Sequence, residues 1–365
     1  MKYILHIIAK LYIGGAEKVA RDIGLYAPEG YENHYVVFGD EVGVYEQPLI
    51  DRGCKVFHMP PPSASYSDFM ANLKKLMEEY KYEAVHAHTM FNAGWVMLAA
   101  KQMNVPVRVA HAHSALDNGS GLKKSVYEAA MRRMILTCAT DLVACGVDAG
   151  KRLFGEKAFS ERGQLILNGI DTAQFAFNAE MRAQMREKLD LQDKFVVGHA
   201  GHLADVKNQK FLIELMPELL KRKDNAVLLL LGEGPDRKML EAKISELGLR
   251  DNVIMTGNVP NVYDYLCAMD VFAFPSLYEG MPLSIVEVQA NGLPCVISDR
   301  VPKDVFLTNL LTPLSIDSAE PWIDAVCKAQ RNAPEKYAAI LKESGFDITT
   351  VVKKFYDIYE RNEHD

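Results

Sequence analysis

The sequence predicts two α/β domains, each built on a doubly wound parallel sheet. Short β-rich runs alternate with longer amphipathic runs from residue 2 onward, and this alternation is typical of such sheets. A loop-like Asn-Gly-Ile-Asp at residues 168–171 interrupts the alternation, which then starts again. The length of 365 residues agrees with two domains, because a typical domain has roughly 150 residues.

The first half of the chain predicts an N-terminal domain of residues 1–168. Its strands are short apolar runs rich in Val, Ile, Tyr and Phe, and its helices carry apolar residues at helical spacing. The expected strands are residues 3–8, 34–38, 55–59, 84–88, 107–110, 142–145 and 164–167. The expected helices are residues 16–26, 68–80, 93–103 and 122–137.

The second half predicts a domain of residues 169–345, followed by a C-terminal helical segment of residues 346–365. The same two periodicities distinguish its elements. The expected strands are residues 195–200, 226–231, 252–255, 271–274 and 295–298. The expected helices are residues 208–222, 237–247, 263–269 and 283–291, and two more at residues 335–344 and 349–362 close the chain without another clear strand.

The composition is that of a globular protein with a core. Hydrophobic residues make up 49% of the chain and charged residues 24%. No stretch approaches the ~18 apolar residues of a membrane span, and the apolar run before Lys10 is too short for a signal peptide. The six cysteines lack C-x-x-C spacing, which favours buried thiols in a reducing compartment. The expected location is the cytoplasm.

The net charge of −7 argues against nucleic acid as a partner, because nucleic-acid binders usually carry a strongly basic domain or stripe. The charge is unevenly divided: residues 1–168 carry a balance of +1 and residues 169–365 a balance of −8. The two halves are therefore expected to face different surroundings.

The most informative segment runs from a strand end at Phe274 into a helix. Pro282 suits the first turn of that helix, because its missing N–H needs no partner there, and Gly292 suits its C-terminal cap. A helix start presents unpaired N–H groups and a positive dipole end, which favour an anion such as a diphosphate. Glu279 and Glu287 border this helix start, and their carboxylates suit sugar hydroxyls. The alternative is that both are ordinary solvated residues.

These two glutamates match the E-x7-E motif of retaining glycosyltransferases with the GT-B fold, in which two Rossmann-like domains face each other across a cleft. The context PSLYEGMPLSIVEVQANGLPCVIS resembles glycosyltransferase family 4 (group 1), and in particular bacterial polysaccharide and capsule biosynthesis enzymes. The upstream segment LLLLGEGPDRKMLEAKISELGLRDNVIMTGNVPNVYDYLCAMDVFAFPS is similar to the donor domain of that family. With GGAEKVA near the start and NGID at the crossover, the resemblance covers nearly the whole chain.

The resemblance implies a function. A retaining enzyme would move a sugar from a nucleotide-diphosphate sugar, with a UDP-sugar preferred, to a hydroxyl acceptor in polysaccharide or lipid-linked glycan synthesis. The N-terminal domain would bind the acceptor, the C-terminal domain would bind the donor, and the last helix would pack back on the N-terminal domain. No cofactor and no metal ion is expected. The donor sugar, the acceptor, the linkage and the oligomeric state are left open.

The resemblance also assigns residues to the donor. Glu279 would lie near the transferred sugar and Glu287 would hold the ribose, while Val259 would contribute backbone contacts to the base. Backbone amides between the two glutamates would bind sugar hydroxyls or phosphate, and these belong to Gly280, Met281, Leu283 and Ser284. Pro282 has no amide hydrogen to give.

A lysine that neutralises the diphosphate is expected at Lys207, after the first strand of the second domain. The physical need is that the leaving nucleoside diphosphate gains negative charge as the glycosidic bond breaks. The chain departs from many relatives at His202, where they have arginine. A histidine has an ordinary pKa near 6.5 and cannot form the bidentate contact of an arginine, so a weaker donor clamp is expected.

The N-terminal half holds seven of the ten histidines, two pairs of them with H-x-H spacing. The resemblance places a histidine near the reacting centre after the strand that ends in VRVA, and His113 fits best, with His111 as the alternative. His86 and His88 are expected to be structural. Members of an H-x-H pair share one strand face and also suit a metal, but no third ligand and no D-x-D motif is evident, so no metal site is expected.

Two further features carry weaker predictions. Gly14 and Gly15 follow the first strand and resemble the family's glycine loop near the diphosphate and the acceptor. Basic residues on the helix at residues 122–137 agree in sign with peripheral contact with an anionic membrane, a habit of family members, while an ordinary solvated face is the alternative. These basic residues are Lys123, Lys124, Arg132 and Arg133.

Three other functions are compatible with parts of the sequence. A sugar-nucleotide epimerase or hydrolase can share the fold, but the lysine and the two glutamates fit a transferase better. A non-catalytic sugar-nucleotide-binding subunit is motivated by His202 in place of arginine. A nicotinamide dehydrogenase is disfavoured, because no G-x-G-x-x-G follows the first strand.

Overall fold

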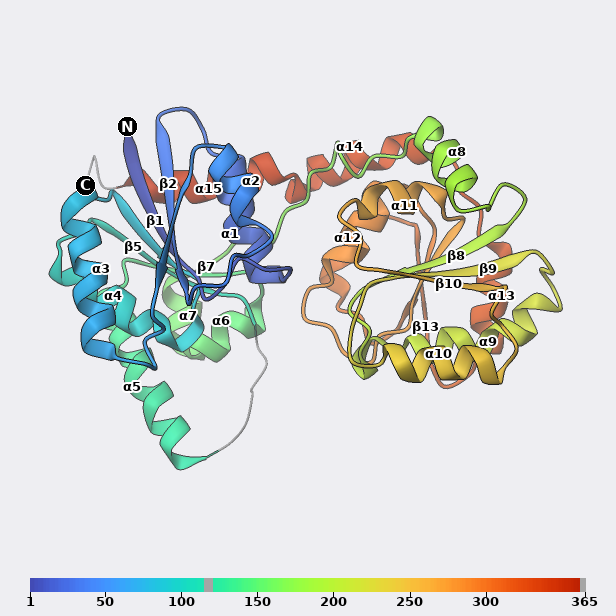
Figure 1. Cartoon of the computed structure of the whole chain (residues 1–365), viewed down its shortest axis with the longest axis horizontal. Helices are drawn as coiled ribbons and strands as arrows, with labels where there is room; N and C mark the ends of the chain where they lie inside the picture. Colours follow the sequence, from blue (N-terminus) through green and yellow to red (C-terminus); the bar gives the residue numbers. More distant parts are fainter. Residues whose placement is uncertain (115–120, 362–365) are drawn as a thin grey trace. The chain divides into compact units, whose positions relative to one another are not determined.

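The computed structural model describes residues 1–114 and 121–361 and divides the chain into two compact units (Figure 1). Unit 1 comprises residues 1–169 and 348–365, and unit 2 comprises residues 170–347. The units divide at 169/170 and 347/348, within one or two residues of the expected boundaries at 168/169 and 345/346.

Unit 1 is built on a parallel sheet of seven strands in the order β3-β2-β1-β4-β5-β6-β7. The order reverses direction between β1 and β4, as in a doubly wound sheet. The strands are β1 Lys2–Ile7, β2 Tyr31–Phe38, β3 Lys55–Met59, β4 Ala84–Ala87, β5 Val107–Ala112, β6 Asp141–Ala144 and β7 Gly163–Leu165. The helices are α1 Gly15–Leu25, α2 Glu46–Asp51, α3 Tyr66–Tyr80, α4 Ala93–Gln102, α5 Leu122–Cys138, α6 Val147–Phe154, α7 Glu156–Arg162 and α15 Ile348–Tyr359.

Helices cover both faces of this sheet, as a buried parallel sheet requires. Leu5, Ile7 and Val85 pack on one face against α3, α4, α5 and α6. Ile4 and Val109 point to the other face, where they pack against α1 and α15. Helix α15, drawn in red beside the blue strands of unit 1 in Figure 1, thus completes the core of the N-terminal unit from the far end of the chain.

Unit 2 is built on a parallel sheet of six strands in the order β10-β9-β8-β11-β12-β13, with the reversal between β8 and β11. The strands are β8 Phe195–Ala200, β9 Ala226–Leu231, β10 Val253–Gly257, β11 Val271–Phe274, β12 Cys295–Ser298 and β13 Leu311–Leu314. The helices are α8 Ala179–Lys188, α9 Gln209–Leu220, α10 Arg237–Glu246, α11 Val262–Ala268, α12 Leu283–Ala290, α13 Glu320–Lys328 and α14 Tyr337–Leu341. Helices α9, α10 and α13 pack on one face, and α11 and α12 lie on the other (Figure 1).

Within residues 1–114 and 121–361, the structure contains one strand and five α-helices that the sequence did not predict. Strand β13 was not predicted because Pro313 interrupts its apolar pattern. A proline has no N–H to donate, so it fits a sheet only where no hydrogen bond to a neighbouring strand is lost. β13 is an edge strand that pairs with β12 alone, which is such a place. The missed helices are α2, α6, α7, α8 and α13, which are six to ten residues long. Five of the six cysteines are buried thiols, as expected, and Cys327 is half-buried.

Candidate functional site

The first candidate site lies where the strand order of unit 2 reverses. Strands β8 and β11 are neighbours there, and their connections leave the sheet at its carboxyl edge in opposite directions. Ligands of open α/β sheets bind at such a point. The loop after β8 carries Lys207, at the end of a 3₁₀ turn over Asp205–Lys207, and the loop after β11 carries Glu279. The topology therefore brings together two residues that are 72 positions apart.

Lys207 and Glu279 form an ion pair with 2.7 Å between Nζ and Oε1. Their side chains are only 20% and 10% exposed, so water screens the pair less than it screens a surface salt bridge. The ammonium group also lies 5.1 Å from the centre of the Phe274 ring. The pair thus presents one cation and one carboxylate side by side, with the cation near an apolar ring.

A buried histidine, which the sequence analysis did not single out, holds the loop after β8. His199 is fully buried, and burial lowers its pKa to about 4, so the ring is neutral near pH 7. Its Nδ1 donates to the Ala273 carbonyl at 2.9 Å, and its Nε2 accepts from the Gln209 amide at 3.2 Å. The same amide donates to the His202 carbonyl at 3.0 Å. His199 therefore ties β8 to β11 and, through Gln209, fixes the backbone beside Lys207.

The loop at residues 232–236 supports the same region from the β9 side. Leu203 N donates to the Glu233 carbonyl at 2.9 Å, and Asp236 N donates to the Leu203 carbonyl at 3.1 Å. Gly232 has a φ of +132°, and a Cβ there would collide with the Gly201 carbonyl. A Cβ on Gly234 would likewise collide with the Leu203 carbonyl. The two glycines of the GEGPD segment are thus required by a close backbone approach.

The predicted helix start is present, with α12 beginning at Leu283. Pro282 is its N-cap residue, one position before the first turn where the sequence had placed it. The amides of Leu283 and Ser284 are in the first turn, where no carbonyl of the same helix can accept their bonds. Gly292 follows the helix with a φ of +65°, the left-handed conformation that suits a C-terminal glycine.

The other donor-site candidates lie in the same unit. Gly280 is exposed, and a Cβ there would meet open space, so the protein's own packing does not explain a glycine at this position. Met281 and Glu287 are half-buried, Glu287 within α12. Val259 is half-buried in the loop between β10 and α11, and the His202 side chain is exposed. The Ser276 hydroxyl, near Glu279 in sequence, is buried without a hydrogen-bond partner among the described residues.

A second constellation lies in unit 1, again where the strand order reverses. His6 on β1 is in register with His86 on β4, and His88 follows β4 directly. His111 lies on β5, next to β4, and His113 follows β5. Four of the five side chains are buried, and His113 is half-buried. The sequence predicted the face shared within each H-x-H pair, but not that three strands would bring five imidazoles together.

The five imidazoles form two hydrogen-bonded chains. The first runs from Asn33 Oδ1 to His6 Nε2 at 3.0 Å, from His6 Nδ1 to His88 Nε2 at 3.3 Å, and from His88 Nδ1 to His113 Nε2 at 2.9 Å. The second joins the Tyr359 hydroxyl to His86 Nδ1 at 2.6 Å and His86 Nε2 to His111 Nδ1 at 3.1 Å.

The expectation that no third ligand accompanies the H-x-H pairs is wrong. His6 lies beside His86 and His88, and one ring nitrogen from each lies within 4.8 Å of the others. His88, His111 and His113 form a second group by the same measure. In the first group the third histidine is His6 on β1. It is about 80 residues before His86 in the chain, but β1 and β4 are neighbours in the sheet. His86 and His88 are thus parts of a cluster and not isolated supporting residues.

Gly14 and Gly15 lie where β1 leads into α1, with Gly14 as the N-cap residue in an extended conformation. A Cβ on Gly15 would meet open space, and one on Gly14 would meet only the flexible Glu17 carboxylate. The packing of unit 1 therefore leaves room beside both residues.

Helix α5 carries the basic residues that were expected to suit an anionic membrane, and Arg132 is the one that the structure uses otherwise. Arg132 donates to the Leu153 and Arg152 carbonyls and lies over the Phe91 ring, so it stabilises the fold of unit 1. Lys123 is exposed, as are the apolar side chains of Leu122 and Val126 in the first turns. Among the described residues, no helix is both long enough and apolar enough to span a bilayer.

Two Rossmann-like units, with a lysine and a glutamate at the switch point of the second, define a GT-B glycosyltransferase fold. Comparison with family models agrees: Glycosyltransferase Family 4 matches residues 13–174, and Glycosyl transferases group 1 matches residues 181–317. A Bacillus subtilis (strain 168) protein, "Putative glycosyltransferase EpsF", is 32% identical over 98% of this chain and 96% of its own length. The chain therefore belongs to the group 1, family 4 glycosyltransferases.

Two further similarities cover nearly the whole chain. The Staphylococcus aureus "Capsular polysaccharide biosynthesis glycosyltransferase CapH" is 22% identical over 98% of this chain and 98% of its own. The crystal structure of Anabaena Alr3699/HepE in complex with UDP has a TM-score of 0.80 at 20% identity, covering 98% of this chain and 99% of that one. HepE was also solved in complex with UDP-glucose, with a TM-score of 0.76. These structural likenesses establish the fold.

Proposed function

We propose that this glycosyltransferase moves a sugar from a UDP-sugar to a hydroxyl acceptor in polysaccharide or lipid-linked glycan synthesis, with retention of the anomeric configuration. The observation that carries the proposal is the Lys207–Glu279 pair at the switch point of unit 2. The UDP and UDP-glucose bound by HepE support the choice of base. The capsular polysaccharide role in the name of CapH supports the class of product.

The proposed chemistry begins with the bond between the sugar and the diphosphate. As that bond stretches, negative charge grows on the leaving diphosphate and positive charge on the anomeric carbon. Lys207 and the first-turn amides of α12 stabilise the diphosphate, because pre-oriented donors lower the energy of the developing charge. Protein groups alone neutralise the diphosphate in this proposal, without a divalent cation. His202 contributes at most one hydrogen bond from an exposed position.

Glu279 accepts hydrogen bonds from sugar hydroxyls in this proposal and is not a covalent nucleophile. Its carboxylate already bonds Lys207, so a donor sugar meets an acceptor whose orientation is fixed. Glu287 holds the ribose, the loop at Val259 contacts the base, and amides from Gly280 to Ser284 bind hydroxyls or phosphate. In unit 1, Gly14, Gly15 and His113 are proposed to serve the sugar and the acceptor. Exposed Leu122, with Lys123 beside it, suits a lipid-linked acceptor at an anionic membrane.

A thermal-shift screen against UDP, GDP, ADP and their sugar conjugates tests the donor. A ligand that binds the native state raises the unfolding midpoint by mass action. We expect a shift with UDP compounds that is lost in Lys207→Met and in Glu287→Gln. Transfer from the selected donor to an acceptor panel, with the product anomer read by NMR, tests retention. An inverted product would contradict the retaining mechanism, and a shift without any transfer would instead support a sugar-nucleotide-binding subunit.

Glu279→Gln is expected to separate binding from turnover. The ion pair holds the Lys207 ammonium on a carboxylate, so removing that charge leaves the lysine more available to a diphosphate. We expect the Kd for UDP to fall by about three- to tenfold, or ~0.7–1.4 kcal/mol. We expect kcat to fall by at least about tenfold, because a neutral amide is a weaker hydrogen-bond acceptor for the sugar.

Calorimetry with UDP and initial rates at saturating donor measure the two effects. Glu214→Gln is the matched control, because Glu214 also forms ion pairs with lysines of unit 2, at 3.7 Å, but on an exposed helix face. Weaker UDP binding by Glu279→Gln would count against a carboxylate that competes with the diphosphate for Lys207.

A further inference from the structure

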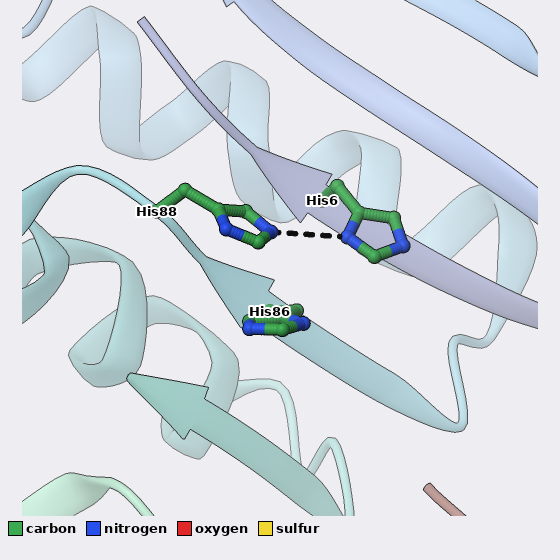
Figure 2. A group of neighbouring side chains, drawn as sticks. All are labelled: His6, His86 and His88. Atoms are coloured by element: carbon green, nitrogen blue, oxygen red, sulfur yellow. Dashed lines mark hydrogen bonds between the residues drawn. The ribbon is translucent and has the colours of Figure 1, made fainter. Parts of the chain in front are cut away.

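Three histidines of unit 1 lie together at the switch point of its sheet: His6 and His88 meet through ring nitrogens, and the His86 ring stacks on that of His88 with 4.1 Å between the ring centres. Figure 2 shows the rings of His6 on β1, of His86 on β4 and of His88 on the loop that follows β4. The cluster is dry, because the three residues are 0%, 0% and 4% exposed. The catalytic proposal, which rests on unit 2 and on His113, uses none of the three.

The spacing of the rings fits a tetrahedral metal ion. Ligand nitrogens at the Zn–N distance of about 2.0–2.1 Å in a tetrahedron lie about 3.3–3.4 Å apart. His6 Nδ1 and His88 Nε2 lie 3.3 Å apart, which is long for a hydrogen bond between nitrogens but matches that tetrahedral edge. A nitrogen of His86 lies within 4.8 Å of both, and the third corner is completed when the His86 ring, which now stacks on His88, turns this nitrogen toward them.

The outer nitrogens already have the partners that metal-binding histidines need. In protein metal sites the second ring nitrogen is held by a hydrogen bond, which fixes the orientation of the ring. His6 Nε2 bonds the Asn33 carbonyl oxygen, and His88 Nδ1 bonds His113. His86 bonds Tyr359 through Nδ1 and His111 through Nε2. A metal ion would replace one of these two hydrogen bonds, and the other ring nitrogen would keep its partner.

The electrostatic state of the cluster also favours a metal. All three side chains are buried, and burial disfavours the protonated imidazolium and favours the neutral ring. Neutral imidazole is the form that binds metal. The ligand set contains no carboxylate, which selects against Mg²⁺ and Ca²⁺ and in favour of Zn²⁺ and its neighbours in the first transition row.

We propose that His6, His86 and His88 bind one divalent transition-metal ion of the zinc class, which ties β1 to β4 beneath helix α15. The three histidines fill three of the four tetrahedral positions, and the site belongs to unit 1, whereas the diphosphate-binding groups belong to unit 2. Helix α15 belongs to it through Tyr359, which bonds His86, and through Phe355, whose ring centre lies 5.4 Å from that of His86. The metal would thus also fix the surface on which the end of the chain packs.

Metal binding would also reverse the tautomer of His113. Without metal, His6 donates from Nε2 to Asn33, so His88 donates from Nε2 to His6, and His113 donates from Nε2 to His88. A metal on His88 Nε2 moves the proton of that ring to Nδ1, which then donates to His113 Nε2. The His113 proton moves to its own Nδ1, and each ring stays neutral. Nitrogen-15 NMR of the histidine rings distinguishes the two states.

The test uses the full chain without a histidine tag, stripped with a chelator and titrated with Co²⁺ and then with Zn²⁺. We expect one equivalent of Co²⁺ with the visible absorption of a tetrahedral site, displacement by Zn²⁺, and a higher unfolding midpoint with metal. His6→Gln keeps a donor toward Asn33 but removes the imidazole, and His86→Gln removes a second one. Both should weaken binding by at least about 100-fold.

His34→Gln is the matched control, since His34 is equally buried on the neighbouring strand β2 but bonds Tyr82 and Glu32 instead. It should bind metal like the wild type. The proposal is overturned if the stripped wild-type protein shows no tetrahedral Co²⁺ spectrum, because that result does not depend on how any variant folds. It is equally overturned if binding survives in folded His6→Gln and His86→Gln, which would place the metal elsewhere.

Discussion

Replacing Lys207 with methionine is expected to lower kcat/KM for the sugar donor by about 10²- to 10³-fold, equivalent to ~2.7–4 kcal/mol of transition-state stabilisation. Lys207 is the cation beside the predicted diphosphate site, and its burial against Phe274 strengthens its interaction with a growing negative charge. Methionine keeps the unbranched shape of the side chain and removes only the charge. Most of the loss should appear in kcat, because the charge on the leaving group is largest in the transition state.

Initial rates across donor concentrations separate kcat from KM, and the unfolding midpoint shows whether the variant is folded. Lys210→Met is the control, because Lys210 is an exposed lysine three positions further along, with its own glutamate partner at 3.7 Å. The control should stay within about twofold of the wild type. A decrease in kcat/KM of less than about threefold in Lys207→Met would show that Lys207 does not stabilise the leaving diphosphate.

The sequence could predict the parts of the donor site that are encoded locally. The segment around Glu279 and Glu287 is a strand end, a loop and a helix start within fourteen residues, so periodicity and turn chemistry predicted these elements. The roles proposed for the two glutamates came from the family resemblance. The meeting of Lys207 with Glu279 required the strand order of unit 2, which places β8 beside β11. His199 was missed because a histidine inside an apolar strand gives no local signal of the carbonyl and amide that it bonds.

The histidine cluster shows the same limit more clearly. The two H-x-H pairs are visible in the sequence, and strand alternation correctly predicted a shared face within each pair. The third partner of His86 and His88 is His6, which becomes a neighbour only because β1 lies between β2 and β4. The tyrosine that bonds His86 is Tyr359, 273 residues further along the chain. No local pattern connects these residues.

Acidification is expected to destabilise the metal-free protein steeply below pH 6.5. Burial lowers the pKa of His6 and of His199 to about 4 and that of His113 to about 3, whereas histidine in an unfolded chain titrates near 6.5. Between these values the unfolded chain binds protons that the native state does not. Stability therefore falls with pH from about 6.5 to about 4, by about 1.4 kcal/mol per pH unit for each such histidine.

Denaturant unfolding of chelator-treated protein at several values between pH 7.5 and 5 measures this slope. Carboxylates titrate mostly below about pH 4.5, so they contribute little within this range. His58→Gln is the control: the Gly39 carbonyl and the Glu46 carboxylate raise the pKa of His58, so its contribution to stability has the opposite sign and is lost as pH rises. Removing His58 should therefore leave the acid slope as steep as in the wild type or slightly steeper.

His6→Gln should instead flatten the slope, because one group that only the unfolded chain protonates is gone. The slope of the unfolding free energy against pH would decrease by about 1.4 kcal/mol per pH unit. This change in slope does not depend on how stable the variant is at pH 7.5. The other histidines of the cluster also take up protons in this pH interval only when the chain unfolds. The slope that remains in His6→Gln therefore comes from them. A flat stability profile between pH 7 and 5 would contradict this prediction, because it would mean that the native state binds as many protons as the unfolded chain over that range.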